Sequence, residues 1–79
     1  MTRFYFDILN SKKTIDSEGQ LFPDLAAARE AALACARDMA AEDVRAGHVF
    51  LRHGIAVRDE QGAEPVFTIS FADAFTISF

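Results

Sequence analysis

The sequence contains little cysteine, proline or basic charge, and no tryptophan. Its 79 residues include one cysteine and two prolines, and 8 Lys+Arg stand against 12 Asp+Glu, for a formal charge of −4. Because Cys35 has no second cysteine to pair with, an internal disulfide is excluded, as is typical of proteins from a reducing cytoplasm. The excess of acid makes nucleic acid an unfavourable partner, since binding phosphates requires a basic face.

Long apolar runs are also missing. Met1-Thr2-Arg3 leads into alternating residues rather than into the continuous apolar region of an export signal. No run approaches the roughly 20 apolar residues of a membrane helix. We therefore expect a soluble, cytoplasmic protein with no membrane segment. Hydrophobic residues still make up 51% of the chain and eight of them are phenylalanine, so we do not expect disorder.

The length of the chain suits a single domain over residues 1–79. A domain of this size buries only roughly 60–65% of the surface that its unfolded chain exposes, so its stability is expected to be marginal. Small domains commonly gain stability from disulfides, metals or oligomerisation. With a disulfide excluded, the sequence favours a homo-oligomer or a protein partner.

Four segments have the composition and alternation of β-strands, at residues 3–9, 13–17, 55–58 and 66–71. In the first, Phe4, Phe6 and Ile8 alternate with more polar positions. The second is polar, with Ile15 as its one clear core candidate, and a loop is expected after it at residues 18–20. In the last strand the apolar residues face one way and Thr68 faces the other.

A single amphipathic helix is predicted over residues 24–46. Asp24 is suited to cap its first turn, and Gly47 is suited to the left-handed residue that ends a helix. Arg29 falls at the edge of the apolar face and Asp43 near its centre. At 100° per residue, the apolar face collects Leu25, Ala28, Ala32, Leu33, Cys35, Ala36, Met39 and Ala40.

These elements predict an α+β fold of the order β-β-α-β-β. An antiparallel sheet carries the amphipathic helix on one face. The first and second strands should form one hairpin and the third and fourth another. The order of the strands in the sheet stays open.

The end of the chain contains a repeat. Phe67-Thr68-Ile69-Ser70-Phe71 recurs as Phe75-Thr76-Ile77-Ser78-Phe79. The repeat is a coincidence, an additional strand, or a kinked and partly helical tail, because its phenylalanines also recur every four residues. We favour an additional strand within residues 72–79, because Thr, Ile and Phe are good strand formers.

An exposed apolar strand of this kind tends to pair with another chain. We therefore take Phe75, Ile77 and Phe79 as the candidate interaction residues.

Residues that could carry enzymatic chemistry are few. No glycine-rich phosphate loop and no nucleophile elbow occurs in the sequence. Cys35 lies on the apolar side of the helix, where an inert buried thiol is usual. His48 and His53 have neither helical nor finger spacing and no fourth metal ligand, and Asp59 and Glu60 suit a turn. We expect no catalytic residue, no cofactor and no metal site, and hence not an enzyme.

A nucleic-acid-binding sheet is the alternative function. Such a surface combines aromatic and basic side chains, and Arg3, Tyr5 and Arg58 are the residues that would supply it. An ordinary polar face of a one-sided sheet explains the same residues.

Motifs along nearly the whole chain resemble a known family. They are the opening Met-x-Arg-Phe-Tyr-Phe, Pro23-Asp24-Leu25, the segment Glu42–Gly47, Ile55-Ala56-Val57-x-Asp59-x-x-Gly62 and Phe71-x-Asp73-Ala74. The chain resembles short bacterial domains of unknown function, found mostly in alphaproteobacteria, with an Arg-Phe/Tyr-Phe-Phe-type first strand. The resemblance implies a bacterial cytoplasmic setting and supports the fold, but it implies no activity. The second copy of the repeat extends past the usual end of the family.

The sequence therefore predicts a non-enzymatic interaction module. It would self-associate or bind a protein partner through a sheet edge and the C-terminal tail.

Overall fold

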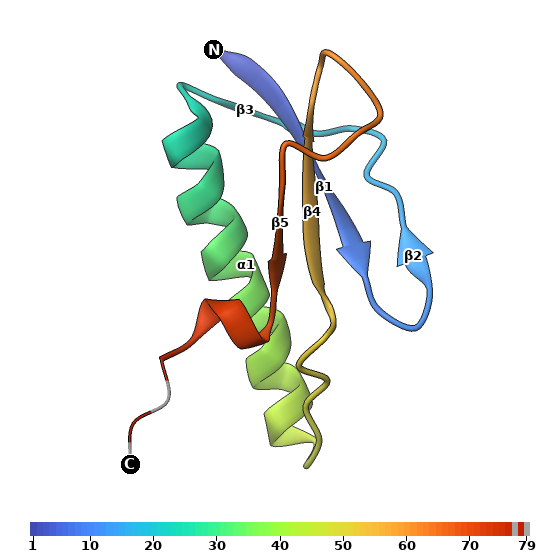
Figure 1. Cartoon of the computed structure of the whole chain (residues 1–79), viewed down its shortest axis with the longest axis vertical. Helices are drawn as coiled ribbons and strands as arrows, with labels where there is room; N and C mark the ends of the chain where they lie inside the picture. Colours follow the sequence, from blue (N-terminus) through green and yellow to red (C-terminus); the bar gives the residue numbers. More distant parts are fainter. Residues whose placement is uncertain (77, 79) are drawn as a thin grey trace.

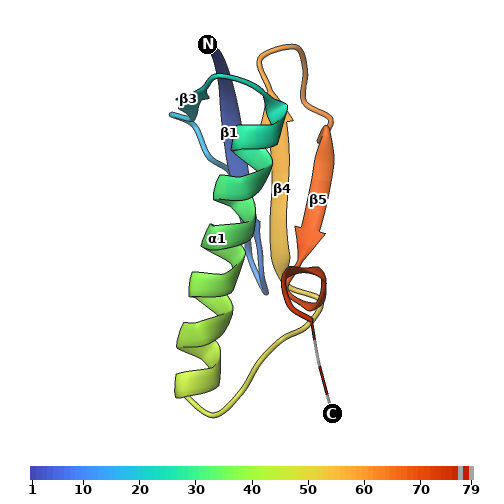
Figure 2. The ribbon, with the colours of Figure 1, turned by 90° about the vertical axis from the view of Figure 1, so that its left-hand side faces the viewer.

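The computed structural model describes residues 1–76 and 78. One helix covers one face of a five-stranded antiparallel sheet, so the predicted α+β class is confirmed (Figures 1 and 2). The elements are β1 (Thr2–Leu9), β2 (Lys13–Thr14), β3 (Gln20–Phe22), α1 (Leu25–Arg45), β4 (Gly54–Asp59), β5 (Phe67–Ser70) and the 3₁₀ helix η1 (Ala72–Ala74).

Strand β1 lies at the centre of the sheet. β4 pairs with one of its edges and β5 pairs with β4, while β2 and β3 share the other edge of β1. The two hairpin pairings expected from the sequence, β1 with β2 and β4 with β5, are both present. The central pairing of β1 with β4 joins segments about fifty residues apart, which the sequence pattern left open.

The second predicted strand differs from the structure. Strand β2 ends at Thr14 instead of residue 17, and a further short strand, β3, begins at Gln20, the last residue of the expected loop. The carboxylate of Asp16 accepts the Phe6 N–H at 3.0 Å, so a side chain bonds the group that a continuous edge strand would bond. Asp16 therefore divides one edge strand into two short ones.

The core lies between α1 and the sheet. Ala28, Ala32, Ala36 and Ala40 form a fully buried row at intervals of four residues along the helix. The facing side chains are larger, and they are Phe4, Phe22, Ile55, Val57, Ile69 and Phe71. Small side chains let the helix lie close to the sheet, and the large side chains of the sheet fill the space between the layers.

The helix begins and ends close to the predicted residues. The Asp24 side chain accepts the Ala27 N–H at 2.8 Å, and Gly47 has a φ of +93° just after the last turn. Leu25 is half exposed, so the buried row starts only at Ala28. The Arg29 guanidinium lies over the Phe67 ring at 5.5 Å, which matches its predicted place at the edge of the apolar face.

The chain after β5 turns instead of continuing as a strand. Asp73 N–H donates to Ser70 Oγ at 3.2 Å, and Ser70 N–H donates to the Asp73 carboxylate at 3.3 Å. This reciprocal pair is a capping box, which starts a helical turn. Arg37 Nε also donates to Ala74 O at 2.7 Å and so holds η1 against the helix. The favoured additional strand is therefore absent over residues 72–76, and Ile77 and Phe79 lie outside the described residues.

Candidate functional site

An apolar groove of about 390 Å³ lies at the end of the molecule where α1 finishes. We call it the terminal groove. Three parts of the chain line it: the end of the helix, the segment between α1 and β4, and the residues after β5. Its lining residues are Ala40, Val44, Val49, Leu51, Ala72, Phe75 and Thr76.

The groove exists because the helix is longer than the sheet. Figure 1 shows α1 running past the ends of β4 and β5. Val44 continues the row of buried alanines by one further interval of four residues, yet its side chain is 60% exposed. Because each interval of four residues turns the row by about 40° around the helix, Val44 lies off the centre of the apolar face, at the end of the helix that the sheet does not reach.

Large apolar side chains line the groove together with Val44. They are Val49, Leu51 and Phe75, which are 36–49% exposed. Contiguous exposed apolar surface on a small protein commonly marks a binding site.

The walls of the groove are held in place by backbone hydrogen bonds. Ala72 N–H donates to Leu51 O at 3.2 Å and Phe71 N–H donates to His53 O at 2.7 Å. These bonds tie the segment before β4 to the start of η1. The groove is thus a built feature of the fold rather than a gap between unconnected segments.

The two histidines pack against a phenylalanine beside the groove. Ring centroids of His48 and Phe50 lie 4.3 Å apart, and those of Phe50 and His53 lie 4.5 Å apart, with nearly parallel planes. His53 also meets the edge of Phe71. Over residues 1–76 and 78, no group of three or more His, Cys, Asp and Glu side chains is placed to hold a metal ion.

A second cluster of functional groups lies on the sheet face opposite the helix. Asp7 is only 2% exposed, and Arg58 holds it through Nε to Oδ2 at 2.7 Å and Nη2 to Oδ1 at 3.1 Å. Arg58 Nη2 also donates to Asp16 O at 2.9 Å, and its guanidinium lies over the Tyr5 ring at 4.8 Å. We call these four residues the polar cluster.

Both carboxylates of the polar cluster are held in the charged form. The hydrogen bond from Arg58 lowers the pKa of Asp7 against the opposing effect of burial. Burial raises the pKa of Asp16, but backbone N–H groups of Gly19, Phe6 and Glu18 outweigh it and the net pKa is lowered. Within the described part of the chain, every buried side-chain polar atom has a hydrogen-bond partner. These hydrogen bonds indicate that the polar cluster has a structural role.

Sequence reasoning did not single out Asp7 or Asp16. Asp7 occupies a polar position in the alternation of β1, which normally indicates exposure to solvent. Its partner Arg58 is 51 residues away, on a strand whose pairing with β1 is not local. No local pattern could have found this contact.

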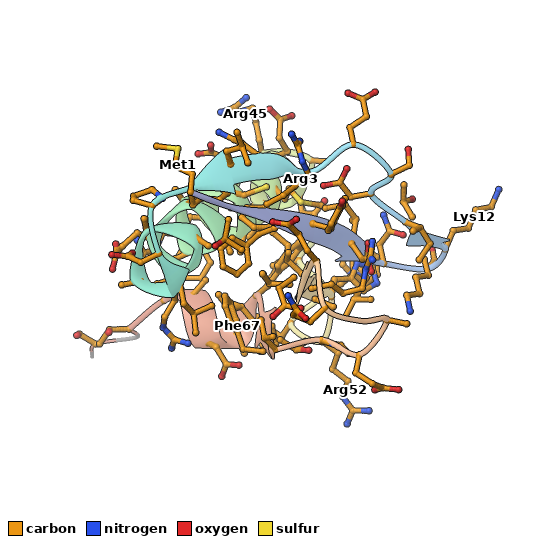
Figure 3. The ribbon with its side chains drawn as sticks, turned by 90° about the horizontal axis from the view of Figure 1, so that it is seen from above. Met1, Arg3, Lys12, Arg45, Arg52 and Phe67 are labelled. Carbon is orange, nitrogen blue, oxygen red and sulfur yellow. The ribbon has the colours of Figure 1, made fainter. Side chains whose placement is uncertain are left out.

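The basic and aromatic residues of the nucleic-acid alternative are engaged within the chain. Arg3 Nη1 donates to Glu18 O at 2.9 Å, while Arg58 is bound to Asp7 and covers Tyr5. Figure 3 shows the labelled Lys12, Arg45 and Arg52 on different sides of the molecule, so these three cations do not gather on one face.

The remaining candidates have ordinary surroundings. Cys35 is half-buried, and burial together with the nearby Asp38 raises the pKa of its thiol, which makes it a weak nucleophile. Asp59 accepts the Gln61 N–H in the turn after β4, and Glu60 accepts the Arg3 N–H. The Asp59 carboxylate stabilises its own turn, as expected of a turn residue, whereas the Glu60 carboxylate bonds the backbone of β1, 57 residues away in the sequence.

Of the predicted interaction residues, Phe75 lies in the terminal groove. Ile77 and Phe79 lie outside the described residues. Sequence reasoning missed Val44, Val49 and Leu51. The helical periodicity gave no signal for Val44, because at 100° per residue it lies off the centre of the apolar face.

A family model described as a domain of unknown function, DUF6894, matches residues 3–72. The chain belongs to the DUF6894 family. The match covers most of the terminal groove, and Phe75 and Thr76 lie beyond it. The resemblance to a family of unknown function is thereby confirmed. No curated protein matches the chain, and no solved structure matches it.

Among residues 1–76 and 78, no helix is long and apolar enough to cross a membrane.

Proposed function

We propose that this DUF6894 protein is a non-enzymatic interaction module that binds apolar protein surface in the terminal groove. The observation that carries the proposal is the exposure of Val44. It lines the groove at the end of the helix and is 60% exposed. A protein partner that covers the groove would bury Val44 and the apolar residues beside it, with a gain of about 25 cal/mol for each Å² of apolar surface removed from water.

The polar cluster supports a structural role rather than a catalytic one. Arg58 and Asp7 satisfy one another, and Asp16 is saturated by backbone N–H groups. A general acid or base needs a proton that it can exchange with a substrate near neutral pH. The lowered pKa values of both carboxylates move them away from that range.

The groove supports binding better than the sheet edge does. Strand β5 forms one edge and has four residues, and the N–H of Ser70 at its end already donates to Asp73. Short edges of this kind offer little to strand addition. The alternative of a nucleic-acid-binding sheet gains no support, because Arg3, Tyr5 and Arg58 are engaged within the chain.

We further propose a bacterial cytoplasmic setting, which the resemblance to short bacterial domains implies. The lone Cys35 supports a reducing compartment.

Selection from a displayed library of random short peptides tests the binding role. The protein is immobilised at low density, so that copies cannot meet. We expect enrichment of peptides with apolar residues at regular spacing. Val44→Gln and Leu51→Gln should each lower the affinity for the selected peptides by about tenfold or more, since each removes apolar contact from the groove.

Leu25→Gln is the matched control. It makes the same type of change in a half-exposed residue at the opposite end of the same helix. Peptide affinity should stay within about twofold of the unmodified protein. The proposal is overturned if neither peptide binding nor association between copies depends on Val44 and Leu51.

A further inference from the structure

We propose that Arg37 is a positioning residue, which holds Phe75 in the wall of the terminal groove from outside the groove. This inference rests on the proposed function, because it names a residue that sets the shape of the same site. Arg37 lies on α1, is exposed, and is not among the residues that line the groove. Phe75 has the largest side chain of the lining and is the first residue after η1. Its position therefore decides much of the surface that a partner would meet.

A hydrogen bond from a charged donor ties the end of η1 to the helix. Arg37 Nε donates to Ala74 O at 2.7 Å. The last carbonyl groups of a helical turn have no partner within the turn, and a cationic side chain can bond them. The donor here comes from α1, 37 residues away, so the bond joins two separate elements that pack together (Figure 1). Hydrogen bonds with a charged donor are shorter and stronger than neutral ones.

The bond acts on Phe75 through the peptide group that joins it to Ala74. The Ala74 carbonyl, the Phe75 nitrogen and the Phe75 Cα lie close to one plane, because the peptide bond has partial double-bond character. A donor that fixes the direction of this carbonyl therefore fixes the direction in which the chain enters Phe75. Phe75 itself is extended, with a φ of −130° and a ψ of 152°.

The other contacts of this segment do not fix that peptide group. Its other hydrogen bonds, among the described residues, are made by residues 70–73 and by the Ala74 N–H. Burial of the Ala74 side chain, which is 2% exposed, determines where this residue lies. Rotation about the ψ angle of Ala74 would still redirect its carbonyl and Phe75 together. The bond from Arg37 removes this freedom.

Nuclear magnetic resonance of the free full-length chain tests the positioning. In the unmodified protein, nuclear Overhauser contacts should join the Phe75 ring to methyl groups of the groove. Arg37→Met removes the donor but keeps a long side chain, so these contacts should be lost while those between α1 and the sheet remain. Arg37→Lys should restore the Phe75 contacts, because lysine Nζ lies slightly further along its side chain than arginine Nε and can reach the same carbonyl.

Arg45→Met is the matched control. It removes a cation from the same helix, beside Val44 of the groove, but this cation forms an exposed pair with Glu42 at 3.7 Å instead of a bond to η1. The Phe75 contacts should be the same in Arg45→Met as in the unmodified protein. A general effect of lost positive charge is thereby separated from the loss of the bond to Ala74.

Affinity for the selected peptides gives a second readout. Arg37→Met should lower it about threefold to tenfold, and Phe75→Ala should lower it by at least as much. If Arg37 acts through Phe75, the two losses do not add. Arg37→Met should then change the affinity of a Phe75→Ala chain by less than about twofold.

Three results would overturn the inference. They are Phe75 contacts that persist in Arg37→Met, Phe75 contacts that are lost in Arg45→Met as well, and losses of peptide affinity that add in the double variant. The first two are measured in the free protein and do not depend on any peptide. If no peptide binds through Val44 and Leu51, the proposed function falls, and the Phe75 contacts still decide the role of Arg37.

Discussion

The polar cluster and the terminal groove differ in which side chains they bury: the first buries a charged residue, and the second exposes apolar ones. In the first, a carboxylate on a strand is almost fully buried, and each of its oxygens has a partner. In the second, a valine at the end of a helix is 60% exposed, with apolar neighbours in the groove that are also exposed. A buried polar group is tolerated when it is hydrogen-bonded. An exposed apolar patch, in contrast, contributes favourable free energy only when another surface covers it. The polar groups of the first region are satisfied within one chain, whereas the apolar side chains of the second region would be buried only by a binding partner.

The largest effect is expected from breaking the polar cluster. Arg58→Met removes the partner of Asp7 and leaves a buried carboxylate unpaired, so the free energy of unfolding should fall by about 3 kcal/mol. Urea titration followed by circular dichroism measures the change. Arg52→Met, at an exposed arginine, should change stability by less than about 0.5 kcal/mol. Equal effects of the two substitutions would show that the cluster is not a stabilising network.

Acid should reduce the contribution of the polar cluster to the free energy of unfolding. The pKa values of Asp7 and Asp16 are lowered in the folded protein, so below their ordinary value the unfolded chain binds more protons than the folded one. Their stabilising contribution is present above an ordinary pKa of about 4 and is lost as the pH falls through the lowered folded values. Urea titrations between about pH 6 and about pH 3 should show this loss.

Arg58→Met sharpens the pH experiment. Without the hydrogen bond from Arg58, burial raises the pKa of Asp7 and opposes ionisation. Between about pH 6 and about pH 3, the free energy of unfolding of the variant should therefore fall by less than that of the unmodified protein. An unchanged slope would contradict the assignment of the acid sensitivity to Asp7.

Two glycines extend the comparison to the backbone. Gly19 has a φ of +69° beside the polar cluster, and an added Cβ would lie 2.9 Å from Arg3 Cγ, Phe4 O and Tyr5 Cδ1. Gly47 has a φ of +93° near the groove, with nothing within 4 Å of such an atom. Gly19→Ala should therefore cost about 2 kcal/mol or more and Gly47→Ala about 1 kcal/mol, in urea titrations. The reverse order would mean that the β2–β3 segment is not held tightly against β1.

The smallest effect on monomer stability is expected at the groove itself. Val44→Gln should change the free energy of unfolding by no more than about 0.5 kcal/mol in dilute protein, because Val44 is mostly exposed there. Urea titration at low concentration measures it, with Leu25→Gln alongside. A loss well above 1 kcal/mol at low concentration would place Val44 in the core of the single chain, contrary to the comparison.

Several features of the fold could be predicted because their causes are local. Alternation within the first strand, the alanine-rich helix, its cap at Asp24 and the glycine at position 47 are all short-range signals, and the structure contains each. The Ser70–Asp73 capping box was equally local. The repeat of Phe-Thr-Ile-Ser-Phe favoured a strand there, but the two hydrogen bonds of the capping box stabilise a helical turn instead.

The candidate sites were less predictable, because they depend on distant segments. Phe75 was selected from the sequence as part of an additional strand, but it lies in the groove because the chain turns at η1. The division of the edge strand at Asp16 depends on a carboxylate that reaches the Phe6 N–H across the hairpin.

By itself the sequence determined the kinds of elements, their order and the apolar face of the helix, since these follow from periodicity and capping within a few residues. Tertiary structure alone decided that Asp7 is buried and where the terminal groove forms. Asp7 is buried because β4 brings Arg58 to it from 51 residues away. The groove forms where the helix continues past the ends of β4 and β5, and the lengths of two layers can be compared only once they are packed together (Figure 1).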